Sequence, residues 1–144
     1  MKITSPAFKE GEKIPVKYTA DGQDVSPALA FEEVPADARS LALVVEDPDA
    51  PMGTWDHWVV FNIPAGERKI EEGATPEGRR GKKNFGKLDY GGPAPPSGTH
   101  RYKFKLYALD KELEPGEGSA KEELQEAMEG NILASAVLMG TYSR

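Results

Sequence analysis

Two short segments carry the side chains of this sequence that could perform chemistry. Asp47-Pro48-Asp49-Ala50-Pro51 holds two acids between prolines, and His57 follows shortly after it. The only other histidine, His100, comes after a turn rich in proline and glycine and two residues before Tyr102. Because proline fixes φ near −65° and restricts the residue before it, both segments have a stiff backbone. Imidazole, carboxylate and phenol groups held in this way could bind an anion or transfer protons.

Anion binding is the first of these two chemistries. Imidazoles donate hydrogen bonds when neutral and become cations when an anion favours protonation, and the Tyr102 hydroxyl would add a neutral donor. Asp47 would repel an anion, so we expect it to orient an imidazole, or to accept a hydrogen bond from a protonated phosphate or an ammonium headgroup. Taken singly, each residue also has an ordinary structural role as a turn cap or a core side chain. The binding hypothesis therefore depends on their combination.

Catalysis is the alternative chemistry for the same residues. His57 or His100 could form an acid–base pair with Asp47. Ser97 or Thr99 could then act as the nucleophile. However, the sequence contains no Gly-x-Ser-x-Gly elbow and no metal motif such as His-Glu-x-x-His. We therefore expect a protein that is not an enzyme and that uses no cofactor or metal, with a hydrolase as the alternative.

Composition narrows the class of protein further. The chain of 144 residues predicts a single domain spanning 1–144, and the lack of cysteine excludes disulfides, thiolate metal sites and a cysteine nucleophile. The formal net charge of −6 argues against binding to nucleic acid or acidic membranes through bulk charge. No apolar run suits a signal peptide or a transmembrane segment, so we expect a cytoplasmic protein.

The elements that must position the candidate residues are mostly strands. Continuous apolar runs at 41–45 and 58–63 predict strands buried on both faces. The segment 102–108 alternates, which places His100 and Tyr102 on the inward face and Arg101 on the outward face. Shorter strands are expected at 16–19 and 29–31, and a last buried strand at 132–139.

One helix is indicated late in the chain. Ser119 followed by Glu122 fits a capping box, and Gly130 would end the helix. The charged, glycine-containing stretch 66–87 predicts a surface loop. Because the strands are too closely joined for βαβ crossovers, the pattern predicts a mainly β fold. An antiparallel two-sheet β-sandwich with one short late helix is the expected architecture.

Three segments in this order resemble the signatures of a known family. They are 47–51, 56–60, and 92–96 with 100–102, and they look like those of the phosphatidylethanolamine-binding protein family, also called Raf kinase inhibitor-like. Segments near both ends of the chain resemble the compact bacterial and archaeal branch, so the similarity covers essentially the whole chain. The resemblance implies a Greek-key β-sandwich with a small pocket at one end that binds anions such as phosphate.

The family pocket transfers residue by residue onto this sequence. The resemblance implies a site made of Asp47, Trp55, His57, Ala94, Pro95, His100 and Tyr102. Ala94 stands where other members have glycine or cysteine, and its methyl group bears on the size of the pocket. The implied ligand is a small anion or a phosphorylated group, such as a phospholipid headgroup. The family also implies a cis peptide bond between Ala50 and Pro51.

Two kinds of protein partner follow from the same resemblance. The family includes regulators that inhibit kinases or proteases, so such a partner is an expectation here. The compact branch lacks the C-terminal helix of the eukaryotic proteins, which leaves surface near the pocket uncovered. We therefore expect a homodimer in which each pocket stays open to solvent.

Overall fold

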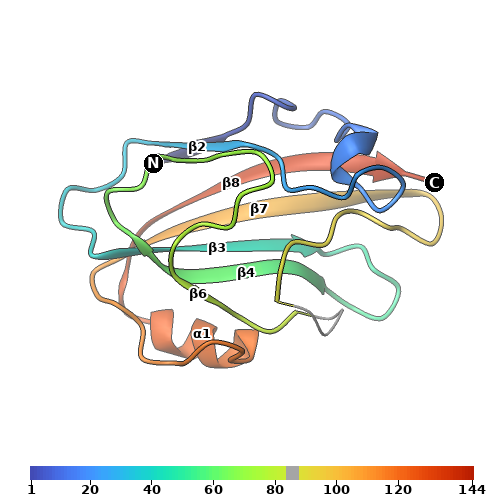
Figure 1. Ribbon diagram of the computed structural model, residues 1–144. Coiled ribbons are helices and arrows are strands. Elements are labelled where there is room, and N and C mark those ends of the chain that lie inside the picture. Colours follow the sequence, from blue (N-terminus) through green and yellow to red (C-terminus); the bar gives the residue numbers. More distant parts are fainter. Residues whose placement is uncertain (84–87) are drawn as a thin grey trace.

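Two antiparallel sheets and one helix form the computed structural model, which describes residues 1–83 and 88–144 (Figure 1). The larger sheet has the strand order β6-β4-β3-β7-β8. Its strands are, in that order, Arg79–Arg80, Trp55–Pro64, Ser40–Asp47, Thr99–Leu109 and Ile132–Ser143. The smaller sheet has the order β1-β2-β5, with strands Lys2–Thr4, Leu29–Glu32 and Lys69–Ile70. The predicted mainly β fold with two antiparallel sheets and one short late helix is confirmed.

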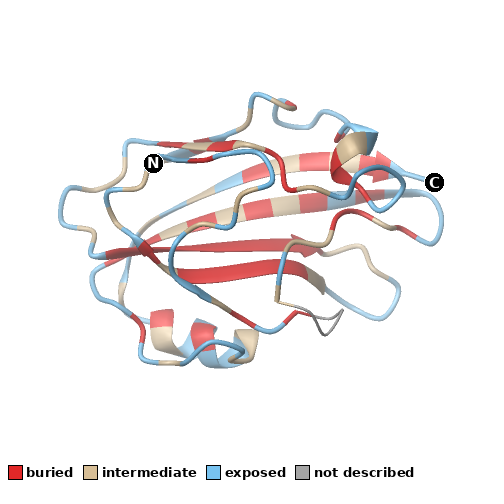
Figure 2. Ribbon diagram, viewed as in Figure 1, coloured by how far each residue is buried: buried red, intermediate tan, exposed pale blue. Residues whose placement is uncertain are grey.

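The central strands β3 and β4 are buried along most of their length (Figure 2). Leu43 of β3 belongs to the core between the two sheets, whereas its neighbour Val44 packs on the opposite face with Leu124 and Met128 of α1 (Lys121–Met128). Because one face of β3 meets the small sheet and the other meets the helix, both faces require apolar side chains. The prediction of buried strands from the runs 41–45 and 58–63 is confirmed.

Strand β7 alternates between the core and solvent, as its sequence pattern predicts. His100, Tyr102 and Phe104 are buried, while Arg101 is exposed. β7 pairs with β3 on one side and with β8 on the other. The N-terminal end of β7 therefore lies beside the C-terminal end of β3, which brings His100 close to Asp47.

The predicted capping box of the helix is wrong. The helix begins at Lys121 after Ala120, and no side chain caps its first turn. The Ser119 hydroxyl instead donates to the carbonyl of Gly116 at 2.6 Å, which closes the preceding turn. The short polar side chain thus bonds to the backbone behind it rather than to the helix ahead. The predicted end is close, because Gly130 follows the helix with φ of +78°.

The segment 16–19 is not a strand, contrary to its β-branched and aromatic composition. Val16–Tyr18 forms a 3₁₀ helix after Pro15, whose φ is −58°. The Tyr18 amide donates to Pro15, and both the amide and the hydroxyl of Thr19 donate to Val16. These local bonds outweigh strand propensity, which depends on context.

Two further expectations need correction. The last strand extends to Ser143 and is not buried throughout, because Ile132, Leu133 and Val137 are exposed. The stretch 66–87 is not only a loop, since β5 and β6 lie within it. Its residues 84–87 lie outside the described part of the chain. In the part that the structure describes, no helix is long and apolar enough to cross a membrane.

Candidate functional site

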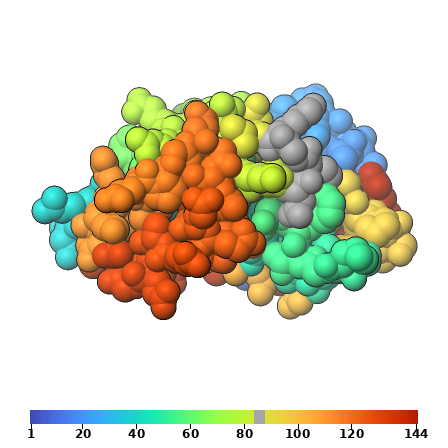
Figure 3. Space-filling model, turned by 90° about the horizontal axis from the view of Figure 1, so that it is seen from below, coloured from blue at the N-terminus to red at the C-terminus, as the bar shows by residue number. Residues whose placement is uncertain are grey.

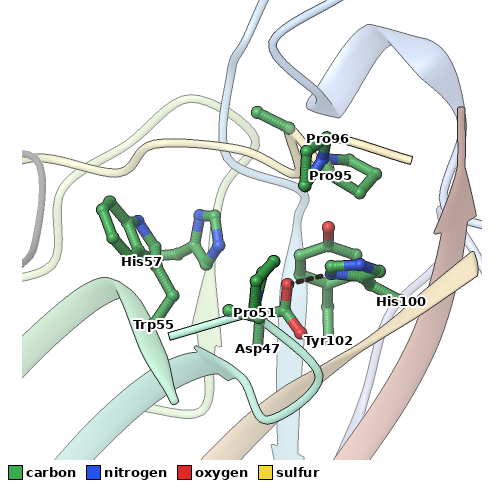
Figure 4. Close-up of a pocket in the computed structure, with 10 residues that line it drawn as sticks. Asp47, Pro51, Trp55, His57, Pro95, Pro96, His100 and Tyr102 are labelled. Atoms are coloured by element: carbon green, nitrogen blue, oxygen red, sulfur yellow. Dashed lines mark hydrogen bonds and ion pairs between the residues drawn. The ribbon is translucent and has the colours of Figure 1, made fainter. Parts of the chain in front are cut away.

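A cavity of about 220 Å³ lies where β3 ends and β7 begins (Figure 4). All seven residues predicted from the sequence line it. Its full lining is Asp47, Ala50, Pro51, Trp55, His57, Ala94, Pro95, Pro96, His100 and Tyr102. The four polar side chains come from β3, β4 and β7, while most of the apolar lining comes from two proline-containing loops. The cavity therefore combines a few hydrogen-bonding groups with apolar walls, as small-molecule sites commonly do.

Asp47 holds the ring of His100. The Nδ1 atom of His100 lies 2.6 Å from Oδ2 of Asp47, and the side chains of both residues are buried. A carboxylate only accepts hydrogen bonds, so Nδ1 carries the proton and Nε2 is the remaining polar atom of the ring. The sequence-based expectation that Asp47 orients an imidazole agrees with this geometry.

The Nδ1 atom of His57 has a neutral partner. It donates to the carbonyl oxygen of Gly91 at 2.8 Å. Burial lowers the pKa of His57 below its ordinary value, and the positive charge of Lys83 lowers it further, although Asp47 acts in the opposite direction. The free protein therefore favours the uncharged ring, and a nearby negative charge would favour the imidazolium.

The Tyr102 hydroxyl is a buried polar group of the cavity that makes no close hydrogen bond. Its side chain is 1% exposed, and the hydroxyl has no hydrogen-bond partner in the described part of the chain. Burial and the nearby Asp47 carboxylate raise the pKa of Tyr102, so the hydroxyl keeps its proton. The ring meets that of His57 edge-on, with centroids 5.4 Å apart. A buried hydroxyl that points into a cavity without a partner is unusual in folded proteins.

The two aspartates of the segment 47–51 stabilise this segment in different ways. Oδ1 of Asp47 accepts the amide of Asp49 at 2.8 Å. The Asp49 carboxylate accepts the backbone amide, Nε and Nη2 of Arg101, at 2.9, 2.9 and 2.8 Å. These bonds to Arg101 lower the pKa of Asp49 to about 2. Asp49 thus supports the loop from outside the cavity.

The expected cis bond between Ala50 and Pro51 is absent, since the described residues contain no cis peptide bond. A tight turn closed by a backbone hydrogen bond reverses the chain instead. The Gly53 amide donates to the Ala50 carbonyl at 3.1 Å, and Gly53 has a φ of +106°. Glycine adopts this conformation without the penalty that a side chain would bring.

Arg144 supports the opposite wall. Its guanidinium binds the Asp21 carboxylate at 2.6 and 3.1 Å and makes a longer contact of 3.4 Å to the Pro95 carbonyl. The Tyr142 hydroxyl also donates to Asp21, at 2.8 Å. Together, these contacts link the proline loop to β8.

The two candidate nucleophiles do not join the site. Neither Ser97 nor Thr99 lines the cavity, and both are exposed. The Thr99 hydroxyl pairs with that of Ser143 at 2.7 Å. The structure therefore brings the predicted binding residues together and leaves both hydroxyls of the catalytic alternative outside.

Sequence reasoning missed two charged residues near the cavity. Lys83 is 5% exposed and lies close enough to His57 to affect its pKa. It belongs to a charged run that has the composition of a solvated loop. Arg144 lies 123 residues from its partner Asp21. No local pattern signals either position, because each depends on contacts made only in the folded chain.

Comparisons with known proteins agree over the whole chain. The family model described as phosphatidylethanolamine-binding protein matches residues 4–143. A UPF0098 protein of Methanothermobacter thermautotrophicus is 47% identical, with 100% of this chain and 99% of the relative covered. A crystal structure of a putative phosphatidylethanolamine-binding protein homologue from Chlamydia trachomatis has a TM-score of 0.96 and 45% identity, covering 99% of this chain and 97% of the other.

A second solved structure extends the comparison. YbcL of E. coli, described as a new member of the mammalian family, has a TM-score of 0.92 and 32% identity, with 99% and 98% of the two chains covered. Sequence and structure thus agree with the resemblance found from the three motifs. The chain belongs to the phosphatidylethanolamine-binding protein family, in its UPF0098 bacterial and archaeal YbcL-like branch.

Proposed function

We propose that this protein is a non-catalytic binding protein whose cavity holds phosphate or a phosphorylated small group, such as a phospholipid headgroup. The observation that carries the proposal is the Tyr102 hydroxyl, which is buried and protonated and makes no close hydrogen bond in the described part of the chain. Leaving a buried donor unsatisfied costs about 1–3 kcal/mol. An acceptor oxygen of a ligand in the cavity would remove that cost.

The rest of the cavity supports an anionic ligand. Nδ1 of His57 and Nδ1 of His100 each bond to protein oxygen, and both rings, whose second nitrogen is Nε2, line the cavity. Protonation makes that atom a donor, and hydrogen bonds from charged donors to an anion are about twice as strong as neutral ones. Buried Lys83 adds positive potential beside His57. These cationic groups offset the repulsion from Asp47.

The dimensions and walls favour a small headgroup. The cavity of about 220 Å³ is smaller than the roughly 300–1,000 Å³ of sites for drug-sized ligands. Pro51, Pro95 and Trp55 form apolar walls that suit the alkyl part of a phosphoester. A phosphate group at the polar end and a short carbon chain along these walls would fill the site.

A regulatory role toward a kinase or protease is the finer part of the proposal. The loop after β3 carries Met52, which is 94% exposed, and the same loop supplies Ala50 and Pro51 to the cavity. A protein partner that contacts this loop would also sense the state of the cavity. Occupation of the pocket and binding of the partner would then be linked.

The test is the substitution Tyr102→Phe, which removes only the hydroxyl. Calorimetry with inorganic phosphate should show an affinity about tenfold lower, the loss of about 1.4 kcal/mol expected for one hydrogen bond. The free energy of unfolding should stay constant or rise, because an unsatisfied polar group is lost. The matched control is Tyr18→Phe. The Tyr18 hydroxyl donates to Glu72 at 2.7 Å, and neither residue lines the cavity. This control should keep the wild-type phosphate affinity.

Two outcomes would contradict the proposal. One is a wild-type protein that does not bind phosphate or phosphoethanolamine at millimolar concentration. The other is equal affinity in the wild type and in folded His57→Ala and His100→Ala variants. Thermal unfolding curves recorded beside the calorimetry establish that each variant is folded.

A further inference from the structure

Strand β4 carries one more residue than the part of β3 with which it pairs. Val45 of β3 lies opposite Trp58, and the next residue of β3, Glu46, lies opposite Asp56. His57 stands between these two pairs as the extra residue. One extra residue on one of two antiparallel strands is a β-bulge, which bends the strand and redirects a side chain. His57 is therefore the bulged residue of β4.

The bulge decides toward which face of the sheet His57 points. Val59 packs on the helix face with Leu124, and Trp58 belongs to the core on the opposite face. Strict alternation would return His57 to the helix face. Instead, His57 lines the cavity on the core side, where its ring meets that of Tyr102 (Figure 4). The orientation of this histidine therefore depends on the bulge.

The backbone and the ring of His57 both bond to Gly91. The Gly91 amide donates to the carbonyl oxygen of His57 at 3.1 Å, and Nδ1 of the ring donates to the Gly91 carbonyl at 2.8 Å. A carbonyl oxygen only accepts, so the uncharged ring carries its proton on Nδ1. Both bonds need the backbone of His57 to lie where the bulge places it. The tautomer of the ring therefore reports on the shape of the bulge.

A lysine of the helix joins the two residues beside the bulge. Nζ of Lys121 lies 2.7 Å from Oδ1 of Asp56 and 3.2 Å from Oε2 of Glu46. The two acids form the strand pair next to His57, and both are largely buried, as is Lys121. Like charges directly opposite each other destabilise a strand pair, so the ammonium between these carboxylates replaces a repulsion with an attraction. We call Glu46, Asp56 and Lys121 the bulge clamp.

The helix gives Lys121 a fixed base. The Gly118 amide donates to the Arg80 carbonyl at 2.8 Å. The Lys82 amide donates to the Ser119 carbonyl, also at 2.8 Å, so the segment before α1 is tied to β6 and the residues that follow β6. Buried side chains of α1 pack on β3 and β4 from this side of the sheet, which the helix covers (Figure 3). Lys121 therefore contacts the two strands from a support that is itself held in place.

We propose that Lys121 is a positioning residue for the cavity, because the bulge clamp holds β4 in the shape that turns His57 toward the ligand. The effect on binding rests on the proposed function, whereas the orientation of His57 can be measured in the free protein. His100 provides an internal comparison, since it lies on β7, whose residues 103–109 pair with β3 in regular register. Loss of the clamp should therefore affect one histidine of the cavity and spare the other.

The tautomer of His57 tests the proposal in the free protein. Long-range proton–nitrogen NMR spectra, recorded above the pH range in which the rings titrate, identify the nitrogen that carries the proton. In the wild type, this nitrogen should be Nδ1 for His57. Lys121→Met should give a mixture of the two tautomers at His57 and leave His100 unchanged, and Lys121→Arg should restore the wild-type spectrum.

The matched control is Lys105→Met. Lys105 also contacts Glu46, but it joins β7 to β3 and not β3 to β4. Its removal takes a positive charge from the same carboxylate and leaves the bulge clamp in place. Lys105→Met should therefore keep the Nδ1 tautomer of His57.

A second variant separates positioning from stability. Lys121→Met combined with Glu46→Gln removes one of the two buried carboxylates and should recover stability, but it still lacks the bridge between the strands. The mixture of tautomers at His57 should persist in it, and it supplies the measurement where Lys121→Met alone does not fold. A single Nδ1 tautomer at His57 in the folded variants, or an equal change at His57 and His100, would overturn the proposal.

Calorimetry with inorganic phosphate tests the consequence for binding. Lys121→Met should lower the affinity by up to about tenfold, the effect of one hydrogen bond from His57. In a His57→Gln background the same substitution should cause no further loss, since both changes act through one ring. An undiminished further loss there would overturn the proposal. A wild type that does not bind phosphate would contradict the proposed function, while the tautomers of His57 would still decide the role of Lys121.

Discussion

Nδ1 of His100 lies 2.6 Å from Oδ2 of Asp47, although 53 residues separate the two in the chain. Strands β3 and β7 are neighbours in the larger sheet, and their register places the two side chains at the same end. His57, on β4, bonds instead to a backbone carbonyl. The Nδ1 atoms of the two imidazoles therefore have different partners, one an anion and the other a neutral group.

We predict that Lys83→Met raises the pKa of His57. The charge of Lys83 opposes protonation of the ring, so its removal leaves burial as the main cause that lowers this pKa. With two histidines in the chain, proton NMR titration follows both rings directly. Lys83→Arg, which keeps the charge, and Lys82→Met, at an exposed neighbour, should both leave the titration of His57 unchanged. An unaltered midpoint in Lys83→Met would show that the two groups do not interact.

Anion binding should take up protons. His57 is uncharged in the free protein near pH 7 because its pKa is lowered, and a bound anion favours the imidazolium and raises that pKa. Between the free and bound pKa values, binding therefore adds protons, and affinity rises as pH falls. Sulfate is the best probe because its own charge is constant over this range. Calorimetry in two buffers of different ionisation enthalpy measures the uptake, which should fall in His57→Gln.

Lys121→Met should lower the free energy of unfolding by about 3 kcal/mol, as expected for the loss of one partner of a buried ion pair. Its ammonium lies 2.7 Å from Asp56 and 3.2 Å from Glu46, which Lys105 also contacts. Burial would raise the pKa of Glu46, but the two lysines together lower it, so its carboxylate depends on them. Urea unfolding measures the loss.

Lys69→Met is the control for this experiment. Lys69 pairs with Glu71 on the surface, where both side chains are largely exposed, and its removal should not change stability measurably. The double variant Lys121→Met with Glu46→Gln should recover part of the lost stability, since it removes one of the two carboxylates that lose the Lys121 ammonium. No recovery would show that Lys121 acts through packing alone.

Hydrolysis of simple esters or phosphoesters should be absent or weak, and Ser97→Ala should not change it. The two residues considered as nucleophiles do not line the cavity, and the Thr99 hydroxyl pairs with that of Ser143. Product release from p-nitrophenyl substrates measures the rate. A turnover of many per second that disappears in Asp47→Ala or His57→Ala would establish an enzyme instead.

The strands that position the cavity could be predicted, because the hydrophobic pattern of each segment indicated only a strand. The run 41–45 is apolar at every position, and β3 is buried on both faces. The alternation through β7 fixed the inward direction of His100 and Tyr102. Local choices between competing hydrogen bonds were not predictable, as the turn made by Ser119 and the 3₁₀ helix after Pro15 illustrate.

The polar residues of the cavity could be found from motifs, but their supports could not. Asp47 and His57 lie near the ends of strands with a clear hydrophobic pattern. Their residue types and their places in the fold therefore both indicate a site. Lys83 and Arg144 have no such signal, and their roles depend on distant contacts. The exposure of Ile132, Leu133 and Val137 in β8 was missed because the hydrophobicity of a segment indicates burial, whether or not another element covers it.

The contacts around Asp49 have a consequence for how this site could vary. Asp47 binds both the ring of His100 and the amide of Asp49, while Asp49 binds Arg101, the residue next to His100. These links close a ring that runs from the interior to the surface and back. A change at exposed Arg101 would therefore shift a histidine of the cavity without touching any ligand. Homologues could acquire different ligand preferences through substitutions that a comparison of cavity residues alone would not reveal.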